Sequence, residues 1–265
     1  MPVLPGIYLD CVFYVYPNRT TAKKAESAGG TGFIVARRFG LVEQTFLVTN
    51  RHVLNSLSEP NIRVNTRDGK SEVVRIPKSW WRDHPEGDDI SAAQVDLPAD
   101  KYQIAWVYEH AFVTPKIIAD HYIGLGDQIV MLGRLSTHHG KVRNMPSARF
   151  GRISMLPSDP IENKFGHRQE TFAAEYFSIA GYSGSPVFVY IPSTARSEEA
   201  LSNSGSGPWL LGINWMHFQA RERVDSDNGA SKGEDSYVIH TGMSGVIPAW
   251  RISSLMVLFD PPPSM

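Results

Sequence analysis

The feature that most constrains the fold of this chain is a series of short apolar runs, each bounded by Gly, Pro, Asn or Asp. Valine, isoleucine and aromatic residues are frequent in these runs, and such residues favour β-strands over helices. The 22 glycines and 18 prolines among 265 residues suit a chain with many tight turns. The sequence therefore predicts an all-β fold.

The C-terminal segment departs from this pattern. Pro248 can occupy the first turn of a helix, and apolar residues then recur at three- and four-residue steps as far as Phe259. The strand series divides near Phe112–Ala119, which predicts two halves, and the polar stretches 193–207 and Gln219–Ser236 are predicted as loops. The predicted strands are Ile7–Tyr16, Thr31–Arg37, Thr45–Thr49, Asn61–Asn65, Glu72–Ile76, Ile90–Val95, Gln103–Val107, Gln128–Leu132, Ala148–Met155, Thr171–Glu175, Pro186–Tyr190, Trp209–Asn214 and Tyr237–Thr241.

The charge and the cysteine content exclude several classes of partner and location. Lys and Arg number 26 and Asp and Glu 27, so the net charge of −1 gives no field that would hold the protein on nucleic acid or anionic lipid. No stretch approaches the roughly 20 apolar residues of a membrane span. The single cysteine, Cys11, cannot form an intramolecular disulfide, and the first residues lack the pattern of a signal peptide. We therefore expect a cytoplasmic protein that binds neither nucleic acid nor a membrane.

The most informative segment is Gly181–Pro186 (GYSGSP), which precedes a predicted strand. Glycines on both sides of Tyr182 and Ser183 allow the backbone to turn sharply and to present its N–H groups to a ligand. A serine hydroxyl is nearly inert at neutral pH, so it needs a base, which an acid usually orients. Ser183 is therefore a candidate nucleophile.

Candidates for the base and the acid occur upstream of this segment. His52 follows an apolar strand, and Asp89 opens the predicted strand that continues to Val95. Asp88 is the immediate alternative to Asp89, and Asp96 lies at the far end of the same strand. The order along the chain is thus base, acid, nucleophile.

These segments resemble sequence boxes of the chymotrypsin-like, or trypsin-like, serine proteases, and most closely those of the bacterial HtrA-type protease domain. Any single box is weak evidence, but seven boxes in the family's order make the resemblance specific. Ile90 follows Asp89 as in the family's acid box, which favours Asp89 over Asp88. The matching segments are Gly30–Val35 (similar to GTGF), Thr49–Val53 (TNxHV), Asp89–Ala92 (DIAV), Gly126–Gly133 (GDxVxxIG), Gly181–Pro186 (GNSGGP), Leu211–Asn214 (VGIN) and Gly245–Pro248 (GFAIP).

The resemblance implies two six-stranded antiparallel β-barrels and a C-terminal helix, with the active site between the barrels. The implied N-terminal barrel, 1–115, carries His52 and Asp89, and the implied second unit, 116–265, carries Ser183. Ser183 would attack a carbonyl, His52 would take and return the proton, and Asp89 would fix the imidazole tautomer. The N–H groups of Gly181 and Ser183 would hold the oxyanion. The implied activity is that of a serine endopeptidase acting on a protein or peptide substrate without a cofactor, with an activating protein partner as a further expectation.

The same resemblance places the specificity pocket beside Ser183. Its floor would be Phe177, six residues before the nucleophile, and no acid is present there to attract Arg or Lys. A small or apolar residue is therefore expected before the scissile bond. The substrate-binding residues of the facing wall would be Ile213, Asn214, Trp215 and Gly245.

Departures from the family keep a second class of function open. Tyr182 stands where secreted trypsins have an Asp, Ser185 replaces a Gly, and no PDZ domain is expected after the barrels. A catalytically inactive trypsin-like barrel that serves as a binding module is the alternative. An α/β-hydrolase is disfavoured because its histidine follows the serine. No metal site is predicted, because His138 and His139 adjoin on a loop and no HExxH or paired CxxC motif occurs. We expect these two histidines and His84 to be solvated.

Overall fold

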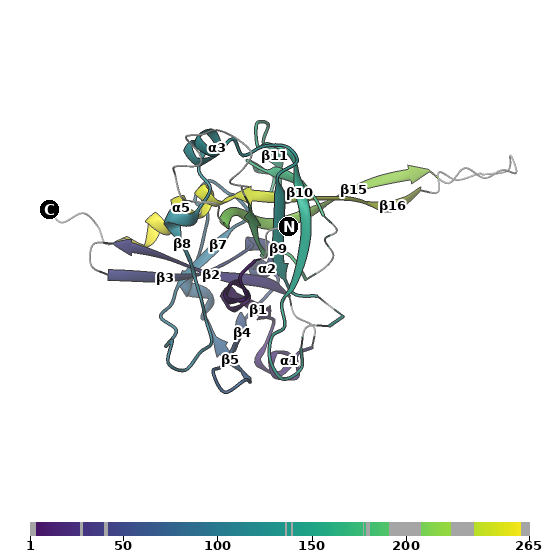
Figure 1. The fold of residues 1–265 in the computed structure, drawn as a ribbon. Helices are drawn as coiled ribbons and strands as arrows, with labels where there is room; N and C mark the ends of the chain where they lie inside the picture. The colour runs from purple at the N-terminus through teal and green to yellow at the C-terminus, as the bar shows by residue number, and fades with distance from the viewer. Residues whose placement is uncertain are drawn as a thin grey trace, which may run out of the picture.

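The computed structural model describes residues 4–26, 29–39, 42–135, 137–138, 140–176, 178, 181–190, 208–223 and 236–260 (Figure 1). The first half of the chain builds an open, curled sheet, and the second half builds a closed six-stranded barrel. The C-terminal helix α5 (Ala249–Met256) follows the last strand. This architecture confirms the predicted all-β, chymotrypsin-like class.

Eight strands form the sheet of the first half. β2 lies between β1 and β3, its residues Phe33 and Val35 point into the core, and the short β8 pairs with it in parallel. The order is β5-β4-β1-β2-β3-β7-β6. Among the described residues the terminal strands β5 and β6 do not pair, so this sheet stays open. It differs in this from the six-stranded barrel that the family resemblance implies. Closure needs a continuous ring of paired strands, and β6 has only three residues. The strands are β1 (Val12–Tyr16), β2 (Gly30–Phe39), β3 (Val42–Thr49), β4 (Asn61–Asn65), β5 (Ser71–Arg75), β6 (Trp81–Asp83), β7 (Ser91–Gln94) and β8 (Val107–Tyr108).

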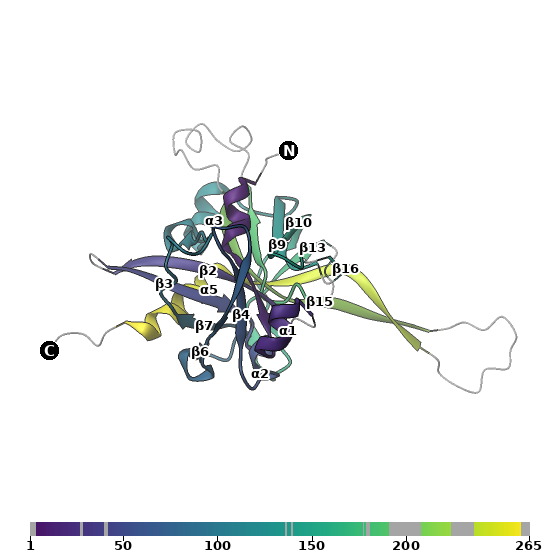
Figure 2. The ribbon, with the colours of Figure 1, turned by 90° about the horizontal axis from the view of Figure 1, so that it is seen from below.

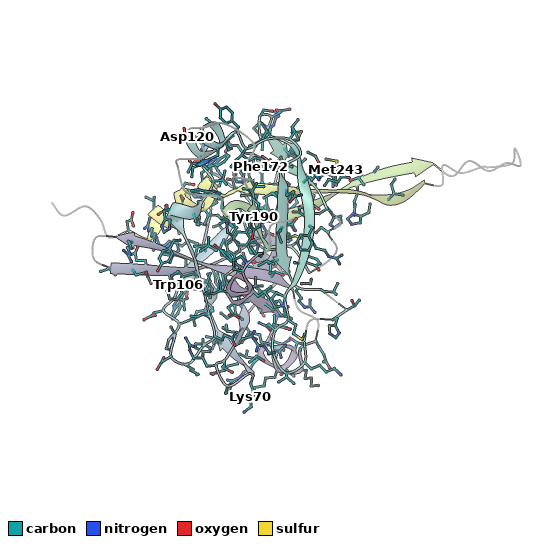
Figure 3. The ribbon with its side chains drawn as sticks, viewed as in Figure 1. Lys70, Trp106, Asp120, Phe172, Tyr190 and Met243 are labelled. Carbon is teal, nitrogen blue, oxygen red and sulfur yellow. The ribbon has the colours of Figure 1, made fainter. Side chains whose placement is uncertain are left out.

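The barrel of the second half is antiparallel throughout, in the order β10-β13-β16-β15-β14-β9. Phe172 of β13, labelled in Figure 3, is fully buried in its core. Two of its strands continue as a two-stranded arm that projects from the body in both views (Figures 1 and 2). The strands are β9 (Gln128–Gly133), β10 (Ser147–Met155), β13 (Phe172–Glu175), β14 (Pro186–Val189), β15 (Trp209–Arg223) and β16 (Ser236–Pro248), and β11 (Ile161–Glu162) and β12 (Arg168–Gln169) form a separate hairpin.

Short helices begin where the sequence supplies a cap. The side chains of Asn18 and Thr114 accept hydrogen bonds from the first turns of α1 (Arg19–Lys24) and α3 (Pro115–His121), and Pro115 fits the first helical position. The sequence predicts neither helix, because one or two turns are too short to show a helical apolar period. The helix α2 (Arg51–Asn55) directly follows β3 and Asn50.

One apolar core joins the two halves. Phe46 of β3, Phe188 of β14 and Leu255 of α5 are fully buried in the same cluster. Ile252, Leu255 and Met256 share the buried face of α5, as their spacing predicts. Because this apolar surface is removed from water only when the halves meet, its burial holds them together.

Several segments differ from the predicted strands and loops. Only Val107 of the predicted strand Gln103–Val107 belongs to a strand, β8, because the N–H groups of Gln103 and Ala105 donate to Asn65 and Asp10 rather than to one neighbouring strand. A 3₁₀ helix, Gly6–Cys11, replaces the first part of the strand Ile7–Tyr16, because Ile7 and Leu9 are exposed and give that segment no core face. Within the polar stretch Gln219–Ser236, the residues up to Arg223 belong to β15, since pairing with β16 satisfies their backbone whatever their side chains. The rest of that stretch before Ser236, and the loop 193–207, lie outside the described residues.

Candidate active site

The loop that carries Ser183 is shaped by two glycines. Gly181 has φ +102° and Gly184 has φ +88°, conformations that favour glycine. A β-carbon at Gly184 would also collide with the carbonyl oxygen of Thr31. The loop can therefore adopt this turn only with glycine at these positions, and it leaves Ser183 partly exposed.

His52 and Asp89 lie side by side. His52 is in the first turn of α2, and its Nδ1 is 2.6 Å from Oδ2 of Asp89. The backbone N–H of His52 donates to the other carboxylate oxygen at 2.8 Å. The Asp89 side chain is fully buried, whereas that of His52 is 18% exposed. The two contacts fix the ring so that Nδ1 faces the acid and Nε2 remains available.

Asp89 is held from both halves of the molecule. The side chain of Asn50 donates to its carbonyl oxygen at 2.8 Å, and its own N–H donates to Oε1 of Gln169 at 2.9 Å. Gln169 lies on β12, 80 residues away, and its Oε1 also accepts a hydrogen bond from Asn163 at 2.6 Å. Sequence reasoning missed Gln169 and Asn163, because neither belongs to a motif and only the fold brings them to Asp89.

A second contact with the acid's loop comes from the helix α5. The guanidinium of Arg251 binds the carboxylates of Asp88 and Glu86, and Nε2 of His84 lies 2.9 Å from the hydroxyl of Ser254. Asp88, the alternative acid, is thus paired with Arg251 and does not reach His52. Burial lowers the pKa of His84 below its ordinary value, so the sequence-based expectation of a solvated His84 is wrong.

Thr31 of β2 connects β3, the strand that precedes His52, to the loop that carries Ser183. Its hydroxyl donates to the carbonyl of Gly181 at 2.7 Å, and its N–H donates to the carbonyl of Ser183 at 2.9 Å. Its own carbonyl accepts the hydroxyl of Thr49 at 2.7 Å, three residues before His52. Gly30, the neighbour of Thr31, lies where Val53 and Ser183 meet, since a β-carbon there would be 2.8 Å from Val53 Cγ2 and 3.0 Å from the Ser183 carbonyl oxygen. Residues near His52 and residues of the Ser183 loop therefore both contact β2.

Tyr182 points away from the site and anchors the loop inside the second barrel. It is fully buried, and its hydroxyl lies 2.6 Å from the hydroxyl of Ser147 and 3.1 Å from Nε of Arg149. On the other side, the amide of Asn214 donates to the Tyr182 carbonyl at 3.0 Å. The neighbouring Ser185 is fully buried against Gly133, where a β-carbon would collide with its hydroxyl. The two departures from the family pattern thus both pack into the barrel wall.

The groups that would perform chemistry form no competing hydrogen bonds with the described residues. Within the described part of the chain, neither Ser183 Oγ nor His52 Nε2 has a hydrogen-bond partner, and they are not bonded to each other. The N–H groups of Gly181 and Ser183 likewise donate to none of the described acceptors. Catalytic hydrogen bonds are often long in unliganded enzymes and tighten only when substrate binds.

The described residues of the expected pocket, Ile213, Asn214, Trp215 and Gly245, are all buried. Ile213 and Asn214 are buried, and Asn214 Oδ1 accepts a hydrogen bond from Tyr176 at 2.9 Å. Trp215 is also buried, and a β-carbon at Gly245 would lie 2.6 Å from its Nε1 and 2.9 Å from Met216 Cγ. Met216 therefore fills space opposite Gly245. Phe177, the expected floor, lies outside the described residues.

The described residues contain no group of three or more His, Cys, Asp or Glu side chains arranged to hold a metal ion. Burial raises the pKa of the Cys11 thiol, which disfavours its reactive thiolate form. None of the described helices has the length and apolar character needed to cross a membrane.

Comparison with known proteins shows the fold. No family model and no curated protein matches the chain. Among solved structures, the protease domain of MamO from Magnetospirillum magneticum in its apo form is 15% identical, with a TM-score of 0.57 over 95% of this chain and 98% of that one. Deg5 is 13% identical, with a TM-score of 0.51 over 93% and 87% of the two chains. The HtrA-type protease AlgW with a decapeptide is 15% identical, with a TM-score of 0.53 over 96% of this chain and 65% of that one. The chain therefore has the fold of trypsin-like serine protease domains.

Proposed function

We propose that the chain is a serine endopeptidase in which Ser183, His52 and Asp89 act as nucleophile, base and orienting acid. The observation that carries this proposal is the 2.6 Å contact between His52 Nδ1 and the buried Asp89 carboxylate. A buried carboxylate on Nδ1 holds the imidazole in the tautomer whose Nε2 can accept a proton. The partly exposed Ser183, on a loop tied to the strand beside His52, is the group whose proton it would accept.

The reaction follows from these roles. Ser183 Oγ forms a bond to the carbonyl carbon of the peptide while its proton passes to His52 Nε2. The resulting imidazolium is stabilised by Asp89 and donates that proton to the amine as the C–N bond breaks. His52 then takes a proton from water as the water attacks the acyl-enzyme, and it returns that proton to Ser183 Oγ as the ester C–O bond breaks and the acid product leaves.

The N–H groups of Gly181 and Ser183 are proposed to stabilise the oxyanion. Both lack a described acceptor, and the Thr31 hydroxyl holds the Gly181 carbonyl. Because hydrogen-bond donors that are already in position need little reorganisation as negative charge develops on the oxygen, they stabilise the transition state. Losing one such donor lowers turnover by on the order of 10²–10³-fold. The loop geometry therefore matters as much as the three side chains.

The substrate is proposed to be a protein or peptide with a small or apolar residue before the scissile bond. The bulk of Met216 opposite Gly245 supports this preference, since it leaves less space for a long side chain beside the nucleophile loop. We further propose a cytoplasmic location, activation by a protein partner, and barrels bounded at 1–115 and 116–265. We propose neither nucleic acid nor a membrane as a partner, because the net charge of −1 gives no field that would hold the protein on either.

Mapping of new protein termini tests the activity. A proteome treated with wild-type protein is compared with one treated with the Ser183→Ala variant, and we expect a restricted set of cleavages that only the wild type produces. Their residues before the cut would be small or apolar. Identical termini in both samples would contradict the peptidase, and cleavage after Arg or Lys would contradict the expected pocket.

A binding module is the second candidate. The observation that favours it is the absence of a hydrogen bond between Ser183 Oγ and His52 Nε2 in the described structure. It predicts that a peptide binds without being cleaved, with the same affinity for the wild type and for Ser183→Ala. Turnover by the wild type alone would exclude it.

A further inference from the structure

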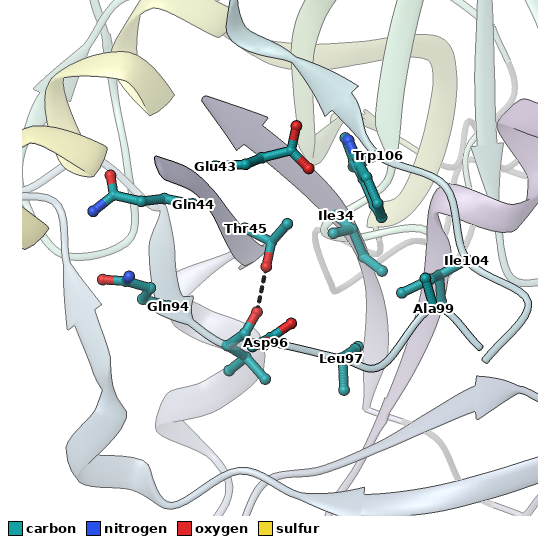
Figure 4. A pocket seen from close by; sticks show the side chains of 11 residues that line it. Ile34, Glu43, Gln44, Thr45, Gln94, Asp96, Leu97, Ala99, Ile104 and Trp106 are labelled. Carbon is teal, nitrogen blue, oxygen red and sulfur yellow. Dashed lines mark hydrogen bonds between the residues drawn. The ribbon is translucent and has the colours of Figure 1, made fainter. Parts of the chain in front are cut away.

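We propose that a pocket on the N-terminal sheet binds an arginine side chain presented by a partner protein. The pocket has a volume of about 250 Å³, the size of one side chain rather than of a drug-sized ligand. Its lining combines apolar residues, an aromatic ring and two carboxylates (Figure 4). The site lies apart from the candidate active site and does not depend on its chemistry.

The position of the pocket follows from strand β7. Asp89 precedes this strand, whereas Val95 and Asp96, which line the pocket, follow it. An extended chain therefore separates Asp89 from the pocket by on the order of 20 Å. Trp106, on the opposite side of the pocket, lies well away from Met243 at the root of the arm (Figure 3). A ligand here would therefore not lie at the candidate active site.

The floor and one wall of the pocket are apolar. Ile34 and Leu97 are buried at its base, and the partly buried Ile104 and Trp106 stand beside them. The hydroxyl of Thr45 does not compete for a ligand, because it donates to the carbonyl of Val95 at 2.5 Å. The site therefore offers surface for an aliphatic stem.

The carboxylates of Glu43 and Asp96 supply the charge. They lie on opposite rims of the pocket, with Glu43 beside Trp106 (Figure 4). Oε2 of Glu43 accepts the hydroxyl of Tyr108 at 2.8 Å, which holds this carboxylate in place. In the described part of the chain, neither carboxylate forms an ion pair within 4 Å, although Arg38 faces Glu43 across strands β2 and β3.

This combination favours a guanidinium over other groups. A planar cation can lie against the indole of Trp106 and form paired hydrogen bonds with a carboxylate, while its stem covers Ile104 and Leu97. A lysine ammonium is a compact charge with stronger hydration and gains less from a flat ring. An apolar side chain would leave both carboxylates without a cationic partner.

The test is a titration of the full chain with the peptide acetyl-Gly-Arg-Gly-amide, followed by the NMR signal of the Trp106 indole N–H. The control peptide carries citrulline, which has the shape of arginine without its charge. We expect a saturable shift with the arginine peptide, at least tenfold weaker binding of the citrulline peptide, and weakening by salt. Glu43→Gln and Asp96→Asn should each weaken binding several-fold, whereas Asp100→Asn, which removes a neighbouring charge outside the lining, should leave it unchanged.

Other outcomes would overturn the proposal. Equal binding of the arginine and citrulline peptides would show that the pocket does not recognise the positive charge of the side chain. A lysine peptide that binds as tightly as the arginine peptide would remove the assignment to guanidinium. Unchanged binding in both carboxylate variants would place the ligand elsewhere.

Discussion

Oε1 of Gln169, on the hairpin of the second half, accepts the backbone N–H of Asp89 at 2.9 Å. Gln169 is buried, and the same oxygen accepts a second hydrogen bond from Asn163. Under the proposed function, the acid that orients His52 is thus fixed by Gln169, a buried residue outside the three candidate catalytic residues. Gln169 is a positioning residue in this arrangement.

Replacing Gln169 with Leu should reduce catalysis without unfolding the protein. The acceptor for Asp89 is lost, and a small displacement of the acid misaligns His52, which can lower kcat by on the order of 10- to 100-fold. KM should change little, because Gln169 is buried away from the substrate. Gln169→Glu retains an acceptor oxygen and should recover part of the activity.

Steady-state kinetics and the low-field NMR signal of the His52 Nδ1 proton measure this effect. The NMR signal does not require turnover, so it separates a failure of this positioning role from a failure of the proposed activity. Gln128→Leu is the matched control, because the Gln128 side chain is hydrogen bonded to none of the described residues. An unchanged His52 signal and unchanged kcat in Gln169→Leu would contradict the role.

The hydroxyl of Thr31 should matter more than its methyl group. Thr31→Val leaves the Gly181 carbonyl and the Arg134 N–H without this partner, which should cost about 1–3 kcal/mol of stability. Thr31→Ser keeps the hydroxyl and should stay close to the wild type. Urea unfolding measures the stability, and equal losses in the two variants would show that packing, rather than the hydrogen bond, is responsible.

Tyr182→Phe tests the anchor of the nucleophile loop. The variant keeps the buried ring but loses the contacts of its hydroxyl with Ser147 and Arg149. We expect a stability loss of about 1 kcal/mol and a slower reaction of Ser183 with an acylating reagent. Ser147→Ala should reproduce much of this loss, and additive losses in the double variant would indicate that the two hydroxyls do not act together.

Stability should fall on acidification through His84. Burial lowers the pKa of His84; the nearby Arg251 acts in the same direction, and Asp88 and Glu86 oppose it. The unfolded chain therefore takes up a proton below the ordinary histidine pKa of about 6.5 while the folded chain does not, so the free energy of unfolding decreases as the pH drops through that value.

The comparison of His84→Gln with wild type isolates this contribution. Urea midpoints measured at about pH 7.5 and about pH 5.5, on either side of the ordinary histidine pKa, should differ less in the variant than in the wild type. His138→Gln, which alters an exposed histidine, should retain the wild-type difference. A pH dependence that is the same in His84→Gln and wild type would contradict the assignment.

The sequence predicts the strands and the ordered motifs because these depend on local composition and spacing. It therefore leads to Ser183, His52 and Asp89, each of which lies in a short motif. Gln169 and Thr31 act through contacts 80 and 150 residues away, and spacing along the chain carries no signal for such contacts. The burial of His84 under α5 escapes prediction for the same reason.

The arm shows a different limit of the sequence. The polar stretch Gln219–Ser236 is predicted as a loop, but its residues up to Arg223 belong to β15, because β15 and β16 satisfy each other's backbone groups. Tyr182 and Ser185 look like weaknesses of the nucleophile motif, yet both are accommodated by the barrel wall beside Gly133. A motif comparison identifies only the type of residue, whereas the effect of that residue depends on the neighbours that the fold places around it.

Reaction of the native protein with a fluorophosphonate, followed by intact-mass and peptide mapping, measures whether Ser183 is an activated nucleophile. We expect one adduct on Ser183, none in Ser183→Ala, and labelling slowed by at least about a hundredfold in His52→Ala. Native protein that does not react, or that reacts equally fast with and without His52, would contradict this expectation.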